Sequence, residues 1–231
     1  MKNLTRYVLY ILFLVIINLS TLNQGSTEIK NRIYISGMYG VGLPEKFDYC
    51  DPDGELSIQY PSNARTLRMS LGYGITNTNI IEFSYNRFDN IMYDNEIIHA
   101  DVNGHFTIND TQLINSTLAL LSIRHSMQGF RNITPYVYAG IGTSNIVAGD
   151  FIHSARQKRE VQYIQQNNKE FAIECGGGIS YSINDSVDID ILKYGYSKLG
   201  ASMSIDPQDH DNIASTELKI HSFSSGVTLK F

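Results

Sequence analysis

The sequence predicts an all-β fold: an eight-stranded antiparallel up-and-down transmembrane β-barrel, preceded by a cleavable signal peptide. Three observations predict it. The first residues have the layout of an export signal, eight later segments alternate apolar and polar residues, and the connections between those segments are short and long in turn. Such alternation is typical of membrane-spanning strands, since one face of each strand meets lipid and the other faces the barrel lumen.

The first 25 residues are expected to be removed during export. Lys2 and Arg6 form a short basic region, an apolar run follows, and small and polar residues occupy 20–26, where cleavage is expected. The alternative is an N-terminal anchor helix, but a run of about 13 apolar residues is too short to span a bilayer comfortably. We therefore expect a signal peptide at 1–25 and one barrel domain at 26–231.

Composition and charge limit the functions that are possible. Two of the 18 lysines and arginines lie in the signal segment, so 16 remain against 23 acidic residues, which gives a mature charge of −7. An acidic surface disfavours nucleic-acid binding. The mean hydropathy of −0.16 does not exclude a membrane protein, because a barrel hides its apolar face from a sliding average. Cys50 and Cys175 are too few for a disulfide scaffold, and we do not expect them to pair.

Eight segments alternate apolar and polar residues with a period of two. They lie near residues 32–42, 65–76, 79–90, 115–127, 133–146, 170–183, 186–198 and 217–231. In 65–76, Leu67 and Leu71 share one face, whereas Arg68 and Ser70 share the other. The polar faces are rich in glycine and serine and carry isolated charges, as expected for a lumen that has space only for side chains.

Two groups of residues test this assignment of faces. The segment 115–127 is ambiguous, since Leu118, Leu120, Leu121 and Ile123 occupy both faces. Seven tyrosines near strand ends are expected on outer faces, where aromatic girdles of membrane barrels lie. They are Tyr39, Tyr73, Tyr85, Tyr136, Tyr181, Tyr194 and Tyr196.

The connection lengths are the strongest evidence for a barrel. The short connections consist of residues that form tight turns and lie at 77–78, 128–132 and 184–185. The long connections lie at 43–64, 91–114, 147–169 and 199–216. Outer-membrane barrels have short periplasmic turns and long extracellular loops. The order therefore predicts an outer-membrane protein with both termini in the periplasm and four loops on the cell surface.

The end of the chain predicts an assembly signal. Val227, Leu229 and Phe231 alternate with Thr228 and Lys230, and the aromatic residue is the last one. A final strand of this kind resembles the signal that the outer-membrane barrel assembly machinery reads. We therefore expect that machinery and outer-membrane lipid as partners.

Four blocks of sequence carry a family resemblance. They are Tyr34-Ile35-Ser36-Gly37 with Tyr39, the segment 135–143 (PYVYAGIGT), the run 177–183 (GGISYSI) and the terminal Phe231. Together they resemble the surface antigens, or major surface proteins, of rickettsia-like intracellular bacteria. The resemblance implies a small outer-membrane barrel that serves as a surface antigen. It does not extend to the long loops, so it implies no partner for them.

Several ionisable residues are expected to face the lumen. They are Arg68, Glu82, Glu174, Asp188 and Asp190, with Arg124 and Lys230 as further candidates. One interpretation is a catalytic or ion-conducting lumen. The other is a salt-bridged plug, because an unpaired buried charge costs several kcal/mol. We favour the plug, since eight strands leave too narrow a lumen for an aqueous channel.

The third long loop carries a basic cluster, Arg156, Lys158 and Arg159. This cluster could bind an acidic host glycan or the phosphates of lipid A, although an ordinary solvated loop face also explains it. No HExxH or GxSxG motif occurs, and no catalytic, cofactor-binding or complete metal-ligand set is found.

These observations predict a non-enzymatic surface antigen whose four loops mediate host contact or adhesion. The alternative is a minor pore or small-solute channel, and a barrel hydrolase is a third hypothesis. Paired lumen charges and bulky plugs would indicate a closed barrel, whereas an uncompensated polar channel would indicate a pore.

Overall fold

The computed structural model describes most of the chain after the predicted signal peptide. The described residues are 30–45, 47–50, 56–101, 104–149, 151–155, 158–163, 166–205 and 213–231. The predicted signal peptide at 1–25 lies outside them, as does Arg156. Among the described residues, no helix is long and apolar enough to cross a membrane.

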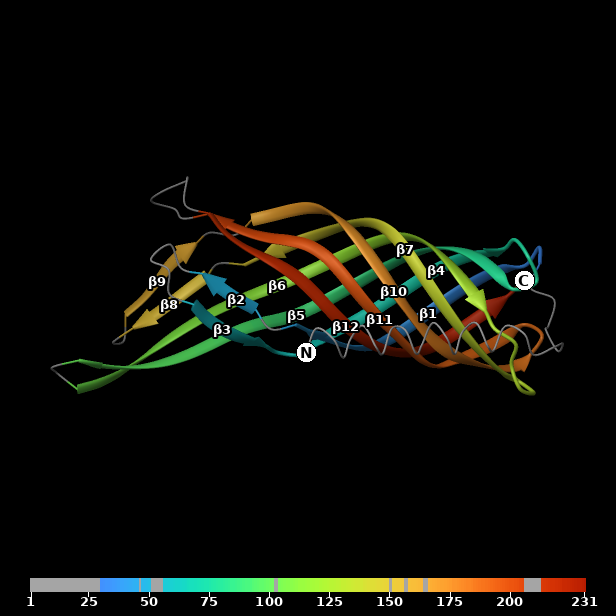
Figure 1. Ribbon diagram of the computed structural model, residues 1–231, viewed down its shortest axis with the longest axis horizontal. Helices are drawn as coiled ribbons and strands as arrows, with labels where there is room; N and C mark the ends of the chain where they lie inside the picture. The colour runs from blue at the N-terminus through green and yellow to red at the C-terminus, as the bar shows by residue number, and fades with distance from the viewer. Residues whose placement is uncertain are drawn as a thin grey trace.

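The described part of the chain forms β-strands. They are β1 (Ile33–Pro44), β2 (Phe47–Cys50), β3 (Leu56–Pro61), β4 (Ala64–Gly74), β5 (Asn79–Asp101), β6 (Gly104–Ser126), β7 (Ile133–Ala148), β8 (Phe151–Ala155), β9 (Lys158–Tyr163), β10 (Gln166–Asn184), β11 (Val187–Ile205) and β12 (Ile213–Lys230). Figure 1 shows the longer strands as tilted ribbons that run along one axis, with β2, β3, β8 and β9 as short arrows near one end.

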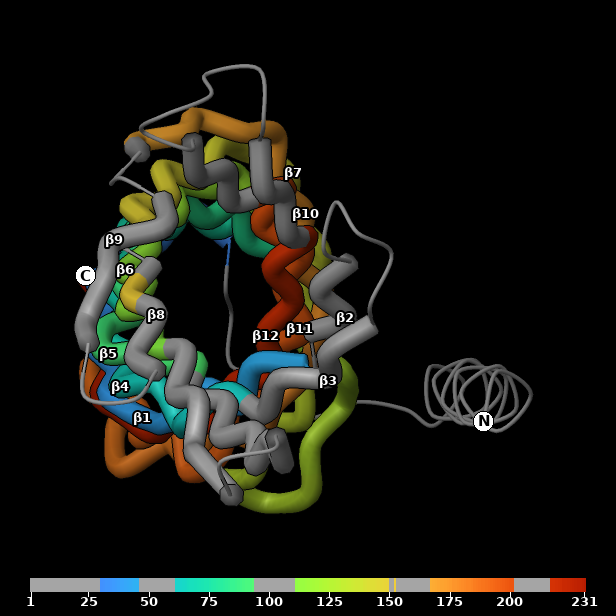
Figure 2. Tube along the Cα trace, turned by 90° about the vertical axis from the view of Figure 1, so that its left-hand side faces the viewer, coloured from blue at the N-terminus to red at the C-terminus, as the bar shows by residue number. Residues whose placement is uncertain are grey.

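Eight of these strands close into a barrel. In chain order β1, β4, β5, β6, β7, β10, β11 and β12 pair antiparallel, each with the next. The last strand pairs with the first, with Tyr34 opposite Lys230 and Gly42 opposite Ser222. The wall appears as a ring in Figure 2. Because closure leaves no unpaired edge in the wall, it satisfies every strand edge with hydrogen bonds. The predicted eight-stranded antiparallel barrel is confirmed.

The two ends of the barrel differ. The short connections at 75–78, 127–132 and 185–186 lie at one end, here called the turn end. The four long connections leave the other end, here called the hairpin end. They were expected to be loops, but most of their described residues are β-structure: β5 and β6 stay paired as far as Asp101 and Gly104, and β11 and β12 as far as Ile205 and Ile213.

Two further hairpins flank the longest one. β2 pairs with β3, which pairs with β5, and β8 pairs with both β9 and β6 (Figure 1). The sequence pattern missed these strand extensions for a physical reason. Period-two alternation arises when one face of a strand is apolar, and segments such as 94–96 (DNE) have no apolar face.

A belt of apolar side chains covers the outside of the wall. Its most exposed members include Tyr39, Met69, Leu71, Phe83, Leu121, Ile123, Ile141 and Phe171. A continuous apolar surface of this size is unfavourable in water, so the belt marks the part of the wall that lies in lipid. The ambiguous segment 115–127 is now resolved: Leu121 and Ile123 point outward, whereas Leu118 and Leu120 are buried in the lumen.

Candidate functional site: the barrel lumen

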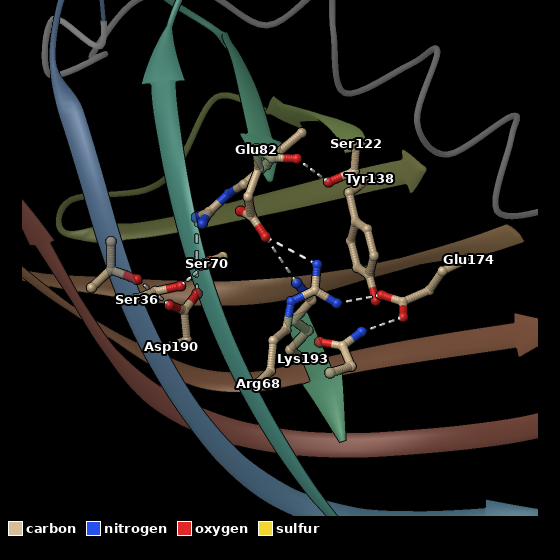
Figure 3. Close-up of polar contacts among 12 residues, drawn as sticks. Ser36, Arg68, Ser70, Glu82, Ser122, Tyr138, Glu174, Asp190 and Lys193 are labelled. Atoms are coloured by element: carbon tan, nitrogen blue, oxygen red, sulfur yellow. Dashed lines mark hydrogen bonds and ion pairs between the residues drawn. The ribbon is translucent and has the colours of Figure 1, made fainter. Parts of the chain in front are cut away.

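A network of ion pairs centred on Arg68 fills the middle of the lumen (Figure 3). Arg68 projects inward from β4 because the pleat places it opposite the outward residues Leu67 and Met69. Its Nη2 donates to Oε1 of Glu82 on β5 at 3.0 Å, and its Nη1 donates to Oε1 of Glu174 on β10. All three charged side chains are buried. One guanidinium therefore links strands on opposite sides of the wall.

Glu174 is fully engaged by its neighbours. Its Oε2 accepts hydrogen bonds from Asn86 Nδ2 at 2.9 Å and from Ser197 Oγ at 3.0 Å. The two oxygens of this buried carboxylate thus accept three hydrogen bonds, of the about four that a carboxylate can accept. Its environment is that of a structural ion pair.

Lys193 completes this central cluster, and the sequence analysis missed it. Its Nζ lies 3.8 Å from Glu82 Oε1 and 4.0 Å from the centroid of the Tyr138 ring. Strict alternation from Asp190 would turn Lys193 toward lipid. A β-bulge between Asp190 and Lys193 prevents this, since Ile191 and Leu192 both face outward. The sequence did contain a sign of this bulge, because the adjacent apolar residues Ile191 and Leu192 interrupt the alternation of the strand.

A second cluster lies toward the turn end. Lys230 Nζ is 2.7 Å from Asp188 Oδ1, and Thr228 Oγ1 donates to Asp190 Oδ2 at 2.7 Å. Arg124 Nη2 is 3.9 Å from Asp190 Oδ1. The structure thus brings together all five residues of the predicted lumen network, in two groups. Among the described residues, the buried charges of the lumen are four cations and four carboxylates, so they balance.

Two tyrosines occupy the lumen beside these charges. Tyr136 was expected in the outer girdle, but it is buried with Tyr138 on the inner face of β7. The expectation was wrong because glycines of the neighbouring strand β10 leave the lumen room for the two rings. A Cβ on Gly178 would lie 2.5 Å from the Tyr136 ring, and a Cβ on Gly176 would lie 2.9 Å from that of Tyr138. Glycines of β10 therefore make the space that the tyrosines fill.

An apolar plug closes the lumen toward the hairpin end. It consists of Ala64, Phe88, Ile91, Tyr93, Ile114, Leu118, Leu120, Ile146, Ala148, Ala172, Leu199, Leu218 and Ile220, all buried. The register places Ala64 opposite Gly42 and Ile220 opposite Pro44, at the far end of β1 from the turns. Seven wall strands, β4, β5, β6, β7, β10, β11 and β12, contribute these side chains, and the plug lies toward the hairpin end from the charged network.

The other predicted residues lie apart from the lumen or outside the description. Val227 and Leu229 face outward in β12, and Phe231 exchanges backbone hydrogen bonds with Ile33 at 3.0 and 3.1 Å. The last residue is therefore part of the closing seam, and its role in assembly stays a prediction. Lys158 and Arg159 lie in β9, but their side chains are outside the described part. No group of described His, Cys, Asp and Glu side chains is arranged to hold a metal ion.

The closed antiparallel wall, the lipid-facing belt and the polar lumen define a transmembrane β-barrel of the outer-membrane class. The turn end then faces the periplasm, and the hairpin end faces the cell exterior.

Solved structures of this class are similar to the chain. Outer membrane protein AlkL, solved by solid-state NMR in DMPC bilayers, matches with a TM-score of 0.51 and 14% identity, over 91% of this chain and 94% of AlkL. OprG from Pseudomonas aeruginosa matches with a TM-score of 0.49 and 13% identity, over 88% and 97% of the two chains. Neisserial surface protein A matches with a TM-score of 0.47 and 16% identity, over 90% and 100%.

No protein-family model and no curated protein matches the sequence. The likeness to AlkL supports the fold of a small outer-membrane barrel. The lipid-facing belt and the closed wall, together with this fold, identify a β-barrel protein of the bacterial outer membrane.

Proposed function

We propose that this protein is a closed, non-enzymatic surface antigen of the rickettsial type, which uses its hairpins to contact a host surface molecule. The observation that carries the proposal is the double block of the lumen. A balanced ion-pair network fills the centre, and an apolar plug lies between that network and the cell exterior.

A double block opposes conduction for two physical reasons. In the central cluster a permeating ion would have to replace Arg68 or one of its carboxylates, and breaking a buried ion pair costs about 3–5 kcal/mol. In the plug it would meet apolar side chains, and stripping water from an ion without replacing it costs far more. The interior therefore stabilises the wall, and we assign the function to the hairpins at the hairpin end, which lie in water.

The hairpin end supplies a scaffold for recognition. The β5–β6 hairpin extends beyond the barrel rim, and β2–β3 and β8–β9 pair with its two sides. Residues on a supported hairpin can vary without unfolding the barrel, which suits an antigen. The basic cluster Arg156, Lys158 and Arg159 belongs to the β8–β9 region, and we propose acidic host glycans as its ligand.

An adhesion assay on intact cells tests this proposal. Ala148 lies opposite Gln166, so residues 149–165 can be replaced by an Asn-Gly turn that continues the existing β7–β10 pairing. We expect this variant to keep a heat-modifiable barrel and to lose adhesion to host cells. The triple variant R156Q/K158Q/R159Q should also lose adhesion and binding to sulfated glycan, whereas K169Q, which removes one exposed charge outside the cluster, should retain both. Unchanged adhesion in the hairpin variant and the triple variant would contradict the proposal.

A further inference from the structure

A small cavity lies at the turn end of the lumen, separate from the hairpins. Its volume is about 30 Å³. It is lined by Arg32, Tyr34, Ile80, Arg124, Ser126, Thr134, Ser180, Ser182, Asp188 and Lys230. A cavity needs about 10–15 Å³ to hold one water molecule, so this one accepts a guest of one or two atoms and excludes larger molecules.

The lining carries more positive than negative charge. Arg32, Arg124 and Lys230 contribute three cations, and Asp188 is the one carboxylate. That carboxylate is already bound by Lys230 at 2.7 Å. Arg32 Nη1 donates to the main-chain oxygen of Asp185 at 2.7 Å, and it has no carboxylate within ion-pair distance among the described residues. The cavity therefore has an excess of hydrogen-bond donors and of positive charge.

Arg124 is the least satisfied of these cations. It is only 8% exposed, and its Nε has no hydrogen-bond partner among the described residues. Its Nη2 lies 3.5 Å from Ser180 Oγ and 3.9 Å from Asp190, both long contacts. The Tyr136 ring covers its face at 3.7 Å. A buried guanidinium with an unpaired N–H is costly, so an acceptor that reaches it would stabilise the barrel.

We propose that this cavity binds a single small inorganic anion of about the size of chloride. The anion would accept from Arg124 and compensate the charge of Arg32, and the hydroxyl groups of the lining would supply further donors. The lining side chains come from β1 and β12, which form the closing seam, and from β6 and β10. The bound anion would therefore link these strands at the turn end. This site goes beyond the proposed surface function and does not depend on it.

Unfolding of the refolded protein in a zwitterionic detergent tests the site. Chloride, bromide or acetate replaces gluconate at constant ionic strength. A ligand that binds only the folded state lowers the apparent unfolding constant about 100-fold at a concentration of 100 times Kd. We expect a decrease of this kind with chloride and bromide, which grows in proportion to the anion concentration once that concentration is well above Kd, and none with acetate. In the same series, ³⁵Cl NMR should show line broadening that bromide reverses.

Variants show where the anion binds. R124Q should abolish the chloride response. Because Arg124 is buried and R124Q could fail to fold, R32Q, at the half-buried rim of the cavity, provides a second test and should weaken the response. K198Q, which removes an exposed cation from the outer wall, should retain it. An apparent unfolding constant that is the same in chloride as in gluconate would mean that the cavity holds water, and it would overturn the proposal. An equal response to acetate would overturn the assignment to a chloride-sized anion.

Discussion

The two halves of the barrel place their apolar side chains on opposite faces of the wall. On β5 near the turn end, Glu82 and Ser84 face the lumen, while Phe83 faces outward. Further along the same strand, Phe88 lies inside, and Arg87 and Asp89 form an ion pair of 2.8 Å on the outside. The change occurs within a few residues of one continuous strand.

β12 shows the same inversion on the other side of the barrel. Toward the turn end, Lys230 lies inside and Val227 outside. Toward the hairpin end, Leu218 lies inside, and Lys219 and Glu217 form an ion pair of 2.6 Å on the outside. The inversion marks where lipid ends and water begins. Inside lipid the wall presents apolar residues outward, so ion pairs and hydrogen bonds hold the lumen; above lipid the barrel has an apolar core, as a soluble β-protein has.

The largest effect is expected from removing the central cation. R68A leaves Glu82 and Glu174 buried without their main partner, which should lower the free energy of unfolding by about 3–5 kcal/mol. R87A removes a cation from the exposed pair beyond the lipid and should cost far less, because water screens an exposed ion pair. Urea unfolding of both variants in lipid vesicles measures the difference. Similar losses would mean that the lumen charges are not the main support of the lipid-embedded half.

The plug is expected to behave as a soluble core. L118A truncates a fully buried side chain and should lower the free energy of unfolding by about 2–5 kcal/mol. Leu121, three residues further along β6, faces outward, so lipid can fill the space that L121A leaves, and a clearly smaller loss is expected. If the two leucines responded equally in the same unfolding assay, the division into inner and outer faces of β6 would be wrong.

The outer wall should respond to depth. F83R places a charge in the lipid-facing belt and should lower the free energy of unfolding by about 2–4 kcal/mol. T117R places the same charge on the outer face of β6, opposite Arg87 and beyond the belt, and should cost about 0–1 kcal/mol. Refolding yields and unfolding midpoints in vesicles test this. An equal penalty at both positions would remove the evidence for a lipid boundary between them.

The glycines of the lumen give the smallest contrast. G178A adds a methyl group 2.5 Å from the Tyr136 ring, and overpacking of this kind costs about 1–3 kcal/mol. G37A is the control, because nothing lies within 4 Å of its added Cβ, so its stability should not fall. Thermal unfolding of the two variants separates a loss of lumen space from a general effect of glycine on strand stability.

Most of the wall could be predicted from the sequence because the membrane enforces its pattern. Where lipid lies outside and polar groups lie inside, alternation is strict, and the faces of Leu67, Arg68 and their neighbours in β4 follow directly. Alternation did not predict the side of a residue where a bulge or the local packing determines it. A bulge turns Lys193 inward, and the space left by Gly178 allows Tyr136 to lie inside.

The hairpin end could be predicted only in part. The long connections were recognised by length, but their strands were not, because water surrounds them and no apolar outer face is required. The plug was equally hidden: apolar residues occupy both faces of 115–127, and only the structure shows that Leu118 and Leu120 lie inside, where the inner face becomes apolar above the lipid. Because the apolar face changes from the outer to the inner side along one strand, alternation alone does not tell which face meets lipid.

Single-channel recording of the refolded protein in planar bilayers tests the central claim, a closed lumen, most directly. We predict a flat baseline for the wild type, because the Arg68 network and the apolar plug block the lumen in series. R68Q, which weakens only the first block, should also give no steady current, since the plug remains. Steady unitary currents through the wild type that change in size or selectivity in R68Q would contradict the closed barrel and favour the pore.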